Sequence, residues 1–197
     1  TINRWHTCPN TARINASNPC SEYMFLDDSA CNLASLNLMK FRTPEADFDV
    51  ESFRRAVDIA VLAQEILIDN SSYPTKAIER NSWDYRALGL GYANLGALLM
   101  ARGLPYDSDE GRAYAAAVTC LMHGEANLQS SRIAREVGPF HGFMRNREPM
   151  LNVMRMHQTE ASKLNREWVP EDLYLSCQTV WNEVIDSGSE HGFRNAQ

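Results

Sequence analysis

The chain has 197 residues, of which 44% are hydrophobic and 22% are charged, as is typical of one soluble globular domain with a sizeable core. Its formal net charge of -6, and the lack of any apolar run near the roughly 20 residues that span a bilayer, predict binding to neither nucleic acids nor membranes. Five cysteines at irregular spacings are unlike a secreted disulfide framework, which predicts a reducing, cytoplasmic location.

The first segment that carries chemistry is Asn18-Pro19-Cys20-Ser21-Glu22. Pro19 fixes its own φ and pushes Asn18 toward extended geometry, so we expect Cys20 at the tip of a loop. In an extended chain, side chains two residues apart point the same way, so Asn18, Cys20 and Glu22 are expected to face one pocket. They would supply an amide, a reactive sulfur and a carboxylate that takes a proton. The alternative is a structural cysteine in an ordinary turn.

A short strand and a long helix are predicted next. Residues 31–38, Cys-Asn-Leu-Ala-Ser-Leu-Asn-Leu, mix apolar and small side chains in a way that favours a buried strand. After a polar connection over residues 40–48, Asp49 is the predicted N-cap of a helix that ends near Asn70. Helical spacing predicts that its buried stripe consists of Val50, Phe53, Val57, Ala60, Val61 and Leu67.

The remainder of the chain predicts mainly helices. The Leu-Gly-Leu-Gly run at residues 88–91 lacks the third glycine of a dinucleotide fingerprint and the lysine of a phosphate loop. We interpret these glycines as positions where two backbones pack closely. Three further helices are predicted, over residues 93–102 before Gly103, from Ser108 to about Val137, and from Pro170 to Gly188.

These elements predict one unit over residues 1–197, with four to six helices in a helix-rich α/β fold. Residues 1–40 would hold the loop and strand, and residues 49–188 mainly helices. Cys120, Cys177 and the Met-rich stretch after residue 149 are predicted to pack in the core. His6, Cys8, Cys20 and Cys31 lack a CxxC pair, and the other histidines lack an HExxH pattern, so no metal site is predicted.

The loop and strand resemble a known family. Asn-Pro-Cys-x-Glu at residues 18–22, followed by residues 31–38, is similar to the active-site loop and following strand of the ribonucleotide reductase catalytic subunit. Residues 18–23 are most similar to its adenosylcobalamin-dependent class. The resemblance continues in order through Asp69-Asn70, Tyr73-Pro74, Leu88 to Gly91, Leu104 to Ser108, Gly138 to Phe140, and Arg194 to Gln197.

The resemblance implies a fold and a set of roles. The helices would pack outside part of a ten-stranded α/β barrel, with the Cys20 loop threaded into its centre. Cys20 would be a transient thiyl radical in the reduction of ribonucleotides to 2′-deoxyribonucleotides, and Glu22 the base at the 3′-hydroxyl. Asn18 and Ser17 would bind substrate hydroxyls. Cys31 would be one of two reducing thiols and would form a disulfide with a cysteine upstream of this chain.

The resemblance also implies partners and a longer protein. Adenosylcobalamin would generate the radical and would be bound mainly by regions outside this chain. A thioredoxin-like protein would recycle the disulfide, and the remainder of the catalytic subunit and a second subunit in a homodimer would complete the enzyme. The alternatives are the iron- or manganese-dependent class, a helical module that binds a partner through its Met-rich face, and a thiol-redox protein. The last would pair Cys20 with Cys31, which needs their Cα atoms within about 7 Å.

Overall fold

The computed structural model describes residues 2–44 and 47–196. Strands β1 (Asn32–Asn37) and β2 (Leu88–Ala93) form a parallel pair, connected through helices α1 (Val50–Asn70) and α2 (Lys76–Tyr85). Parallel strands need such a crossover, because a tight turn can join only antiparallel strands. The other elements are α3 (Leu95–Ala101), α4 (Asp109–Val137), α5 (Phe143–Ala161), α6 (Glu171–His191) and the 3-10 helices η1 (Ile2–Trp5), η2 (Leu38–Phe41) and η3 (Arg166–Trp168).

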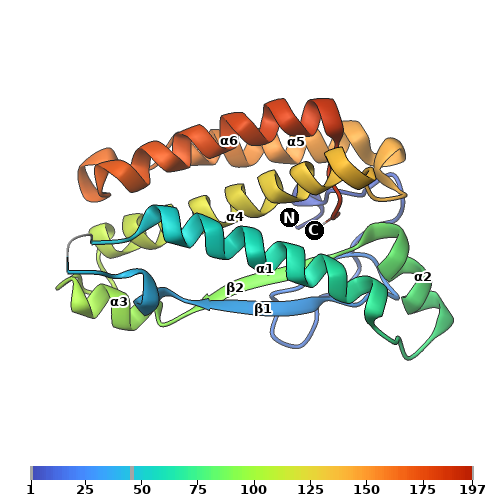
Figure 1. Ribbon diagram of the computed structural model, residues 1–197, viewed down its shortest axis with the longest axis horizontal. Helices are drawn as coiled ribbons and strands as arrows, with labels where there is room; N and C mark the ends of the chain where they lie inside the picture. The colour runs from blue at the N-terminus through green and yellow to red at the C-terminus, as the bar shows by residue number, and fades with distance from the viewer. Residues whose placement is uncertain (1, 45–46, 197) are drawn as a thin grey trace.

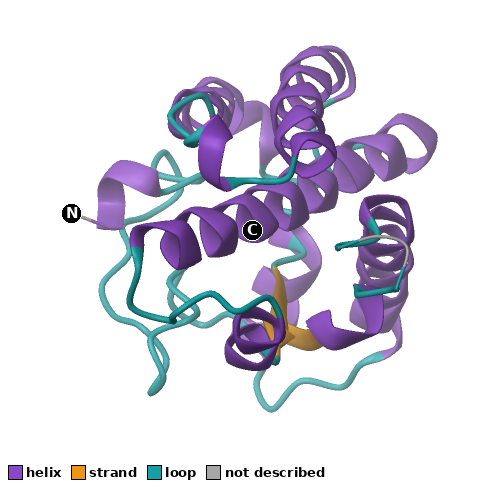
Figure 2. Cartoon of the chain, turned by 90° about the vertical axis from the view of Figure 1, so that its left-hand side faces the viewer, coloured by secondary structure: helices purple, strands orange, loops and turns teal. Residues whose placement is uncertain are grey.

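The helices stack in layers on the two strands. Helix α1 lies along the sheet, α4 packs on α1, and α6 packs on α4 beside α5 (Figure 1). Figure 2 shows the strands at the base of a molecule made mostly of helices. The core follows these contacts, and its fully buried side chains include Phe53, Tyr114, Val118, Leu121, Val180 and Trp181.

The predicted helix ends are largely confirmed. The Asp49 carboxylate accepts a hydrogen bond from the Ser52 backbone N–H, and the Ser108 hydroxyl accepts one from Gly111 N–H. Each cap satisfies one of the N–H groups that the first helical turn leaves without a partner. Helix α4 ends at Gly138, whose φ of 86° favours glycine, as the sequence predicted.

Helices α2 and α5 were not predicted individually, and α1 and α6 each differ in one detail from the sequence-based prediction. On α1, Leu67 is 52% exposed, and Gln64, Glu65 and Ile68 are buried in its place. Helix α6 does not end at Gly188 but continues to His191 and ends at Gly192. Gly188 lies within it because the Phe193 ring packs where a side chain would be: an added Cβ would lie 2.2 Å from Phe193 Cζ.

The Leu-Gly-Leu-Gly run forms strand β2, which was not predicted as a strand, and the helix predicted from residue 93 begins only at Leu95. Gly89 pairs with Leu33, and a Cβ added to Gly89 would lie 2.6 Å from Cys31 Sγ. The expected close approach is therefore found at Gly89, where side chains rather than a backbone fill the space, but not at Gly91, where an added Cβ would lie 3.7 Å from Ser35 Oγ. The described residues contain two strands, so a ten-stranded barrel stays a prediction.

Parts of some predictions lie outside the described residues. These are Thr1, residues 45–46 of the polar connection, and Gln197 of the last matched motif. Among the described helices, none combines the length and apolar character needed to cross a bilayer.

The contact between α4 and α6 predicts the effect of Gly124→Ala. An ideal Cβ at Gly124 would lie 2.5 Å from Cγ1 of the fully buried Val180, whose branched side chain has little freedom to move. We expect a destabilisation of about 1–3 kcal/mol, seen as a lower Tm of the intact protein.

Gly96→Ala in α3 is the matched control, because its Cβ would have its nearest neighbour 4.0 Å away, at Tyr106 Cδ2. This change should leave Tm unchanged or raise it slightly, since alanine favours helix. Equal Tm values for the two variants would contradict the close contact between α4 and α6.

Candidate active site

The segment around Cys20 is a tight turn closed by three hydrogen bonds. Asn18 N–H donates to Tyr23 O at 3.1 Å, and Tyr23 N–H donates to Asn18 Oδ1 at 3.0 Å. Ser21 N–H donates to Asn18 O at 3.1 Å. Pro19 and Cys20 therefore form the tip of the turn, and the Cys20 thiol is exposed and free, as expected for a loop tip.

Because of this turn, the side chains of residues 18–22 do not point in the directions predicted for an extended chain. Ser21 has a φ of 63°, which reverses the chain and breaks the extended alternation assumed from the sequence. Asn18 Nδ2 donates to Glu22 Oε1, so these two side chains do meet. Ser21 and Glu22 line the adjoining cavity, whereas Cys20 is not among the described residues of its wall. Ser17 is exposed, and its hydroxyl donates to Asn18 O at 2.9 Å.

The cavity has a volume of about 520 Å³, which is within the usual range for small-molecule sites. Its wall comes from the N-terminal segment, α1, β2, α4, α5 and the C-terminal segment. One group of wall residues is polar and includes Glu22, Gln64 and Asn195, and another consists of aromatic and imidazole rings. Such a cavity could hold a ligand with both an apolar ring and polar groups.

Cys31 lies immediately before β1, half-buried against the backbone of β2. Gly89 on β2 leaves the space for its sulfur. Burial and the negative charge of nearby Glu22 together raise the pKa of Cys31 to about 11. The Cys31 thiol therefore keeps its proton at neutral pH, and it lies close enough to Glu22 for the two groups to interact electrostatically.

Gln64 on α1 joins the beginnings of the two strands. Its side-chain amide donates to Asn32 O and to Gly89 O, each at 2.8 Å, and the residue is only 2% exposed. Both amide hydrogens are used, and the buried Oε1 has no hydrogen-bond partner among the described residues. Gln64 was not among the residues predicted for the site, although a glutamine in the apolar stripe of a helix is a usable signal.

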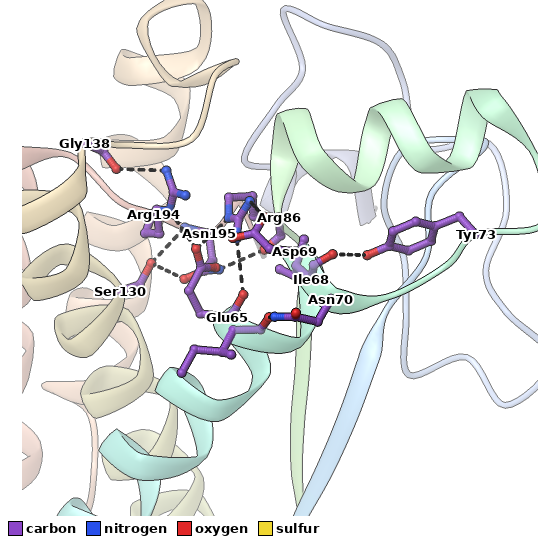
Figure 3. Close-up of polar contacts among 11 residues, drawn as sticks. Glu65, Ile68, Asp69, Asn70, Tyr73, Arg86, Ser130, Gly138, Arg194 and Asn195 are labelled. Atoms are coloured by element: carbon purple, nitrogen blue, oxygen red, sulfur yellow. Dashed lines mark hydrogen bonds and ion pairs between the residues drawn. The ribbon is translucent and has the colours of Figure 1, made fainter.

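Glu65, the next residue, is the centre of a buried polar network (Figure 3). Its Oε1 accepts hydrogen bonds from Arg86 Nε at 2.6 Å and from Arg194 Nε at 2.7 Å. Its Oε2 accepts one from Asn195 Nδ2 at 2.7 Å. Asp69 accepts two more from the Arg86 guanidinium, which lowers the pKa of Asp69. These contacts fix the C-terminal segment against α1, so the cavity wall at Asn195 is held in place.

The ring-lined part of the cavity is built around two histidines. The rings of His123 and His157 meet edge to face with centroids 4.4 Å apart, and Trp181 stacks on His157 at 5.3 Å. Burial, together with the neighbouring His157, lowers the pKa of His123 to about 3, and burial lowers that of His157 to about 4. Both rings are neutral at neutral pH and pack as structural residues. In the part of the chain that the structure describes, no three His, Cys, Asp or Glu side chains are grouped closely enough to hold a metal ion.

Comparison with known proteins gives the family. A family model described as "Ribonucleotide reductase, barrel domain" matches residues 1–197. The chain belongs to the ribonucleotide reductase family. This confirms the resemblance that the loop and strand motifs indicated, and it argues against an unrelated helical interaction module.

Individual relatives agree with the ribonucleotide reductase assignment. A protein of Rhodopirellula baltica named vitamin B12-dependent ribonucleotide reductase is 54% identical over the whole chain, which covers 19% of that protein. A protein of Streptomyces clavuligerus with the same name is 48% identical, and the chain covers 21% of it. A Mycobacterium tuberculosis protein named vitamin B12-dependent ribonucleoside-diphosphate reductase is 35% identical over 75% of the chain. The chain spans about a fifth of the length of these curated relatives.

Glu65→Gln tests the buried network. The change removes the negative charge shared by Arg86 and Arg194 and places an N–H group against their donors. Loss of one partner from a buried ion pair costs about 3–5 kcal/mol, so Tm of the intact protein should fall markedly.

Glu51→Gln, on the same helix, is the matched control, because Glu51 pairs with Arg55 on the surface. Such a pair contributes less than about 1 kcal/mol. If both substitutions lowered Tm equally, Glu65 would not have the central structural role assigned to it.

The two neutral histidines predict sensitivity to acid. Their folded-state pKa values lie below the ordinary value of 6.5, so the unfolded chain binds more protons between pH 6.5 and about 3. Stability should therefore fall as the pH is lowered through this window. His157→Phe keeps a ring against Trp181 and removes one titrating group, so its Tm should decline less between pH 7 and pH 4.5.

His141→Phe is the control, since the His141 side chain is 83% exposed and lies outside the cavity wall. Its Tm should decline with falling pH as steeply as that of the unmodified protein. If Tm declined equally steeply with falling pH in His157→Phe and His141→Phe, the buried histidine pair would be ruled out as the cause of the acid sensitivity.

Proposed function

We propose that this chain forms the active-site portion of a ribonucleotide reductase that converts ribonucleotides to 2′-deoxyribonucleotides. The observation that carries the proposal is the contact between Asn18 and Glu22 at the cavity, beside Cys31, with Cys20 at the tip of the same turn. An acid, an amide and two thiols are the groups that this reaction requires. The family match supports the same reading.

The chemistry explains the need for these groups. The 2′-hydroxyl of a ribose is a poor leaving group, and removal of the 3′-hydrogen weakens the neighbouring C–O bond. In the proposed reaction, Cys20 as a thiyl radical takes the hydrogen from C3′ and returns it at the end. Glu22 accepts the proton of the 3′-hydroxyl, and Asn18, supported by Ser17, holds Glu22 and the substrate hydroxyls in position.

Cys31 supplies one of the two reducing thiols. Two thiols and one ribonucleotide give one disulfide, one 2′-deoxyribonucleotide and one water, so the two electrons come from the sulfur atoms. A pKa of about 11 supports this role, because Cys31 retains the hydrogen that it must give up. Its disulfide partner would be a cysteine upstream of this chain. A thioredoxin-like protein would then reduce the disulfide by thiol exchange.

The cofactor is proposed from the relatives, whose names say that they depend on vitamin B12. Adenosylcobalamin would supply the radical initiation, which a protein leaves to a cofactor. The described residues do not form a pocket for it: a corrin is much larger than the ligands that fit a cavity of about 520 Å³, and Cys20 is open to solvent. We therefore assign cobalamin binding to other parts of the protein. The relatives' names favour this class over the iron- or manganese-dependent one.

Finer features of the enzyme follow from the same proposal. A diphosphate substrate is proposed because the Mycobacterium tuberculosis relative is named a ribonucleoside-diphosphate reductase. We place the protein in the cytoplasm, where thiols stay reduced between turnovers. The remainder of the catalytic subunit would complete the barrel, and two such subunits would form a homodimer.

Cys20→Ser in the intact protein tests the proposal. A serine hydroxyl cannot form the thiyl radical, so formation of 2′-deoxyribonucleotide should be abolished while the fold and Tm are retained, because residue 20 is exposed. The measurement is product formation with adenosylcobalamin and a dithiol.

Cys120→Ala is the control variant, because this cysteine lies on α4 outside the described cavity wall. It should reduce activity only through a modest loss of packing. Equal losses in the two variants would contradict the role given to Cys20.

A further inference from the structure

Two cysteines face each other where α4 meets α6. Cys120 lies on α4 and Cys177 lies on α6, and both are free thiols. Cys177 Sγ donates to Ala117 O at 3.2 Å, one helical turn before Cys120. Trp181, one turn after Cys177 on α6, donates its Nε1–H to Cys120 Sγ at 3.2 Å, so both sulfurs lie at the same contact between the two helices. They are 57 residues apart in sequence, so only the packing of α4 on α6 brings them together.

The two helix backbones approach unusually closely at this point. Gly124 lies one turn after Cys120, and an added Cβ would be 2.5 Å from Val180 Cγ1 and 3.3 Å from Trp181 Nε1. Val180 and Trp181 lie one turn after Cys177 on α6. A disulfide needs Cα atoms about 4.4–6.8 Å apart, a separation that adjacent helices reach only where small residues face each other. Gly124 provides that condition beside the thiol pair.

The surroundings make the two thiols unequal. Cys120 is half-buried, and its sulfur accepts a hydrogen bond from Trp181 Nε1 at 3.2 Å. The neighbouring Cys177 thiol and the Trp181 N–H lower the pKa of Cys120. Cys177 is fully buried, and the neighbouring Cys120 sulfur, together with burial, raises its pKa. Cys120 is therefore the more acidic and the less buried of the two thiols, and Cys177 is the protonated partner behind it.

We infer that Cys120 and Cys177 form an oxidation site, in which a hydroperoxide oxidises Cys120 and Cys177 then closes a reversible disulfide between α4 and α6. This site is separate from Cys20 and Cys31, and it does not rest on the proposed function. Its ligand class is a small peroxide.

The reaction balances with the peroxide as the only oxidant. The Cys120 thiolate attacks one peroxide oxygen, the O–O bond breaks, and Cys120 becomes a sulfenic acid while the second oxygen leaves as water or alcohol after protonation. The Cys177 sulfur then attacks the sulfenic sulfur, and the hydroxide that leaves takes the Cys177 proton as water. Overall, two thiols lose two protons and two electrons, and the peroxide is reduced. A dithiol reverses the step by exchange.

Peptide mapping of the intact protein tests this inference. The protein is treated with hydrogen peroxide under native conditions, unfolded in iodoacetamide and digested with trypsin, which releases peptides 113–132 and 167–194 with one cysteine each. We expect these peptides joined together, two hydrogens lighter than their sum, with loss of alkylation at both cysteines and recovery after dithiothreitol. The buried Cys8 is the internal control and should remain alkylated.

Two variants separate the roles of the two thiols. In Cys177→Ala, Cys120 should accumulate as a sulfenic acid that dimedone traps, without the joined peptide. In Cys120→Ser, Cys177 should remain fully alkylated, because it lacks the partner that reacts first. Met100, which is 75% exposed, reports that the peroxide dose was effective. Conversion of Met100 to the sulfoxide while Cys120 and Cys177 both stay alkylated, or oxidation of Cys120 without joining to Cys177, would overturn the inference.

Discussion

The buried carboxylate of Glu65 is the contact on which the arrangement of the helices and the C-terminal segment depends. It accepts hydrogen bonds from Arg86, Arg194 and Asn195, which belong to two separate parts of the chain. With Asp69 added, two carboxylates face two guanidinium groups, so the formal charges cancel within the network. Buried ions stabilise a fold only when their charges and hydrogen bonds are matched in this way. The result is a rigid joint between α1, the start of β2 and the chain after α6.

Gln64 and Glu65 make helix α1 the connector between the sheet and the helical layers. Gln64 binds the backbones of β1 and β2, whereas Glu65 binds Arg86, just before β2, and the C-terminal segment. Asn195 also donates to Arg86 O at 3.0 Å, so the turn before β2 is held by side chains from both directions. This turn leads directly into β2, on which Gly89 lies beside Cys31. The network around Glu65 thus lies next to the strand that packs against the Cys31 sulfur.

Local signals in the sequence predicted the elements whose causes are local. Asp49 and Ser108 cap helices through their own side chains, and Gly138 ends α4 through its own φ. Strand β2 could not be predicted in this way, because Leu-Gly-Leu-Gly has weak strand propensity and becomes a strand only by pairing with β1. The prediction that Gly188 ends the last helix was wrong for a related reason. A glycine near a helix end indicates termination, and only the tertiary contact with Phe193 explains its place inside α6.

The candidate site was predictable in composition and less so in geometry. The residue types at 18–22 predicted a loop with an exposed cysteine at its tip, and the family resemblance implied roles for them that stay predictions. The direction of each side chain depends on Ser21, which adopts a left-handed φ that is common for glycine and asparagine and rare for serine. Nothing in the sequence signals this conformation, so the alternation rule failed there. Gln64 and Glu65, by contrast, interrupt an apolar stripe, and that interruption was readable from the sequence.

The surroundings of the cysteines show that the pKa of a thiol depends on its neighbours in the folded structure rather than on its neighbours in the sequence. Cys31 keeps its proton because it is buried beside the Glu22 carboxylate, whereas the neighbouring Cys177 thiol and the Trp181 N–H lower the pKa of Cys120. In the proposed reduction, Glu22 receives a proton from the substrate. The negative charge that raises the pKa of Cys31 is then lost, and Cys31 releases its own proton more readily. In this proposal the base and the reducing thiol are coupled, because the pKa of Cys31 would fall at the stage when the leaving 2′-hydroxyl needs a proton.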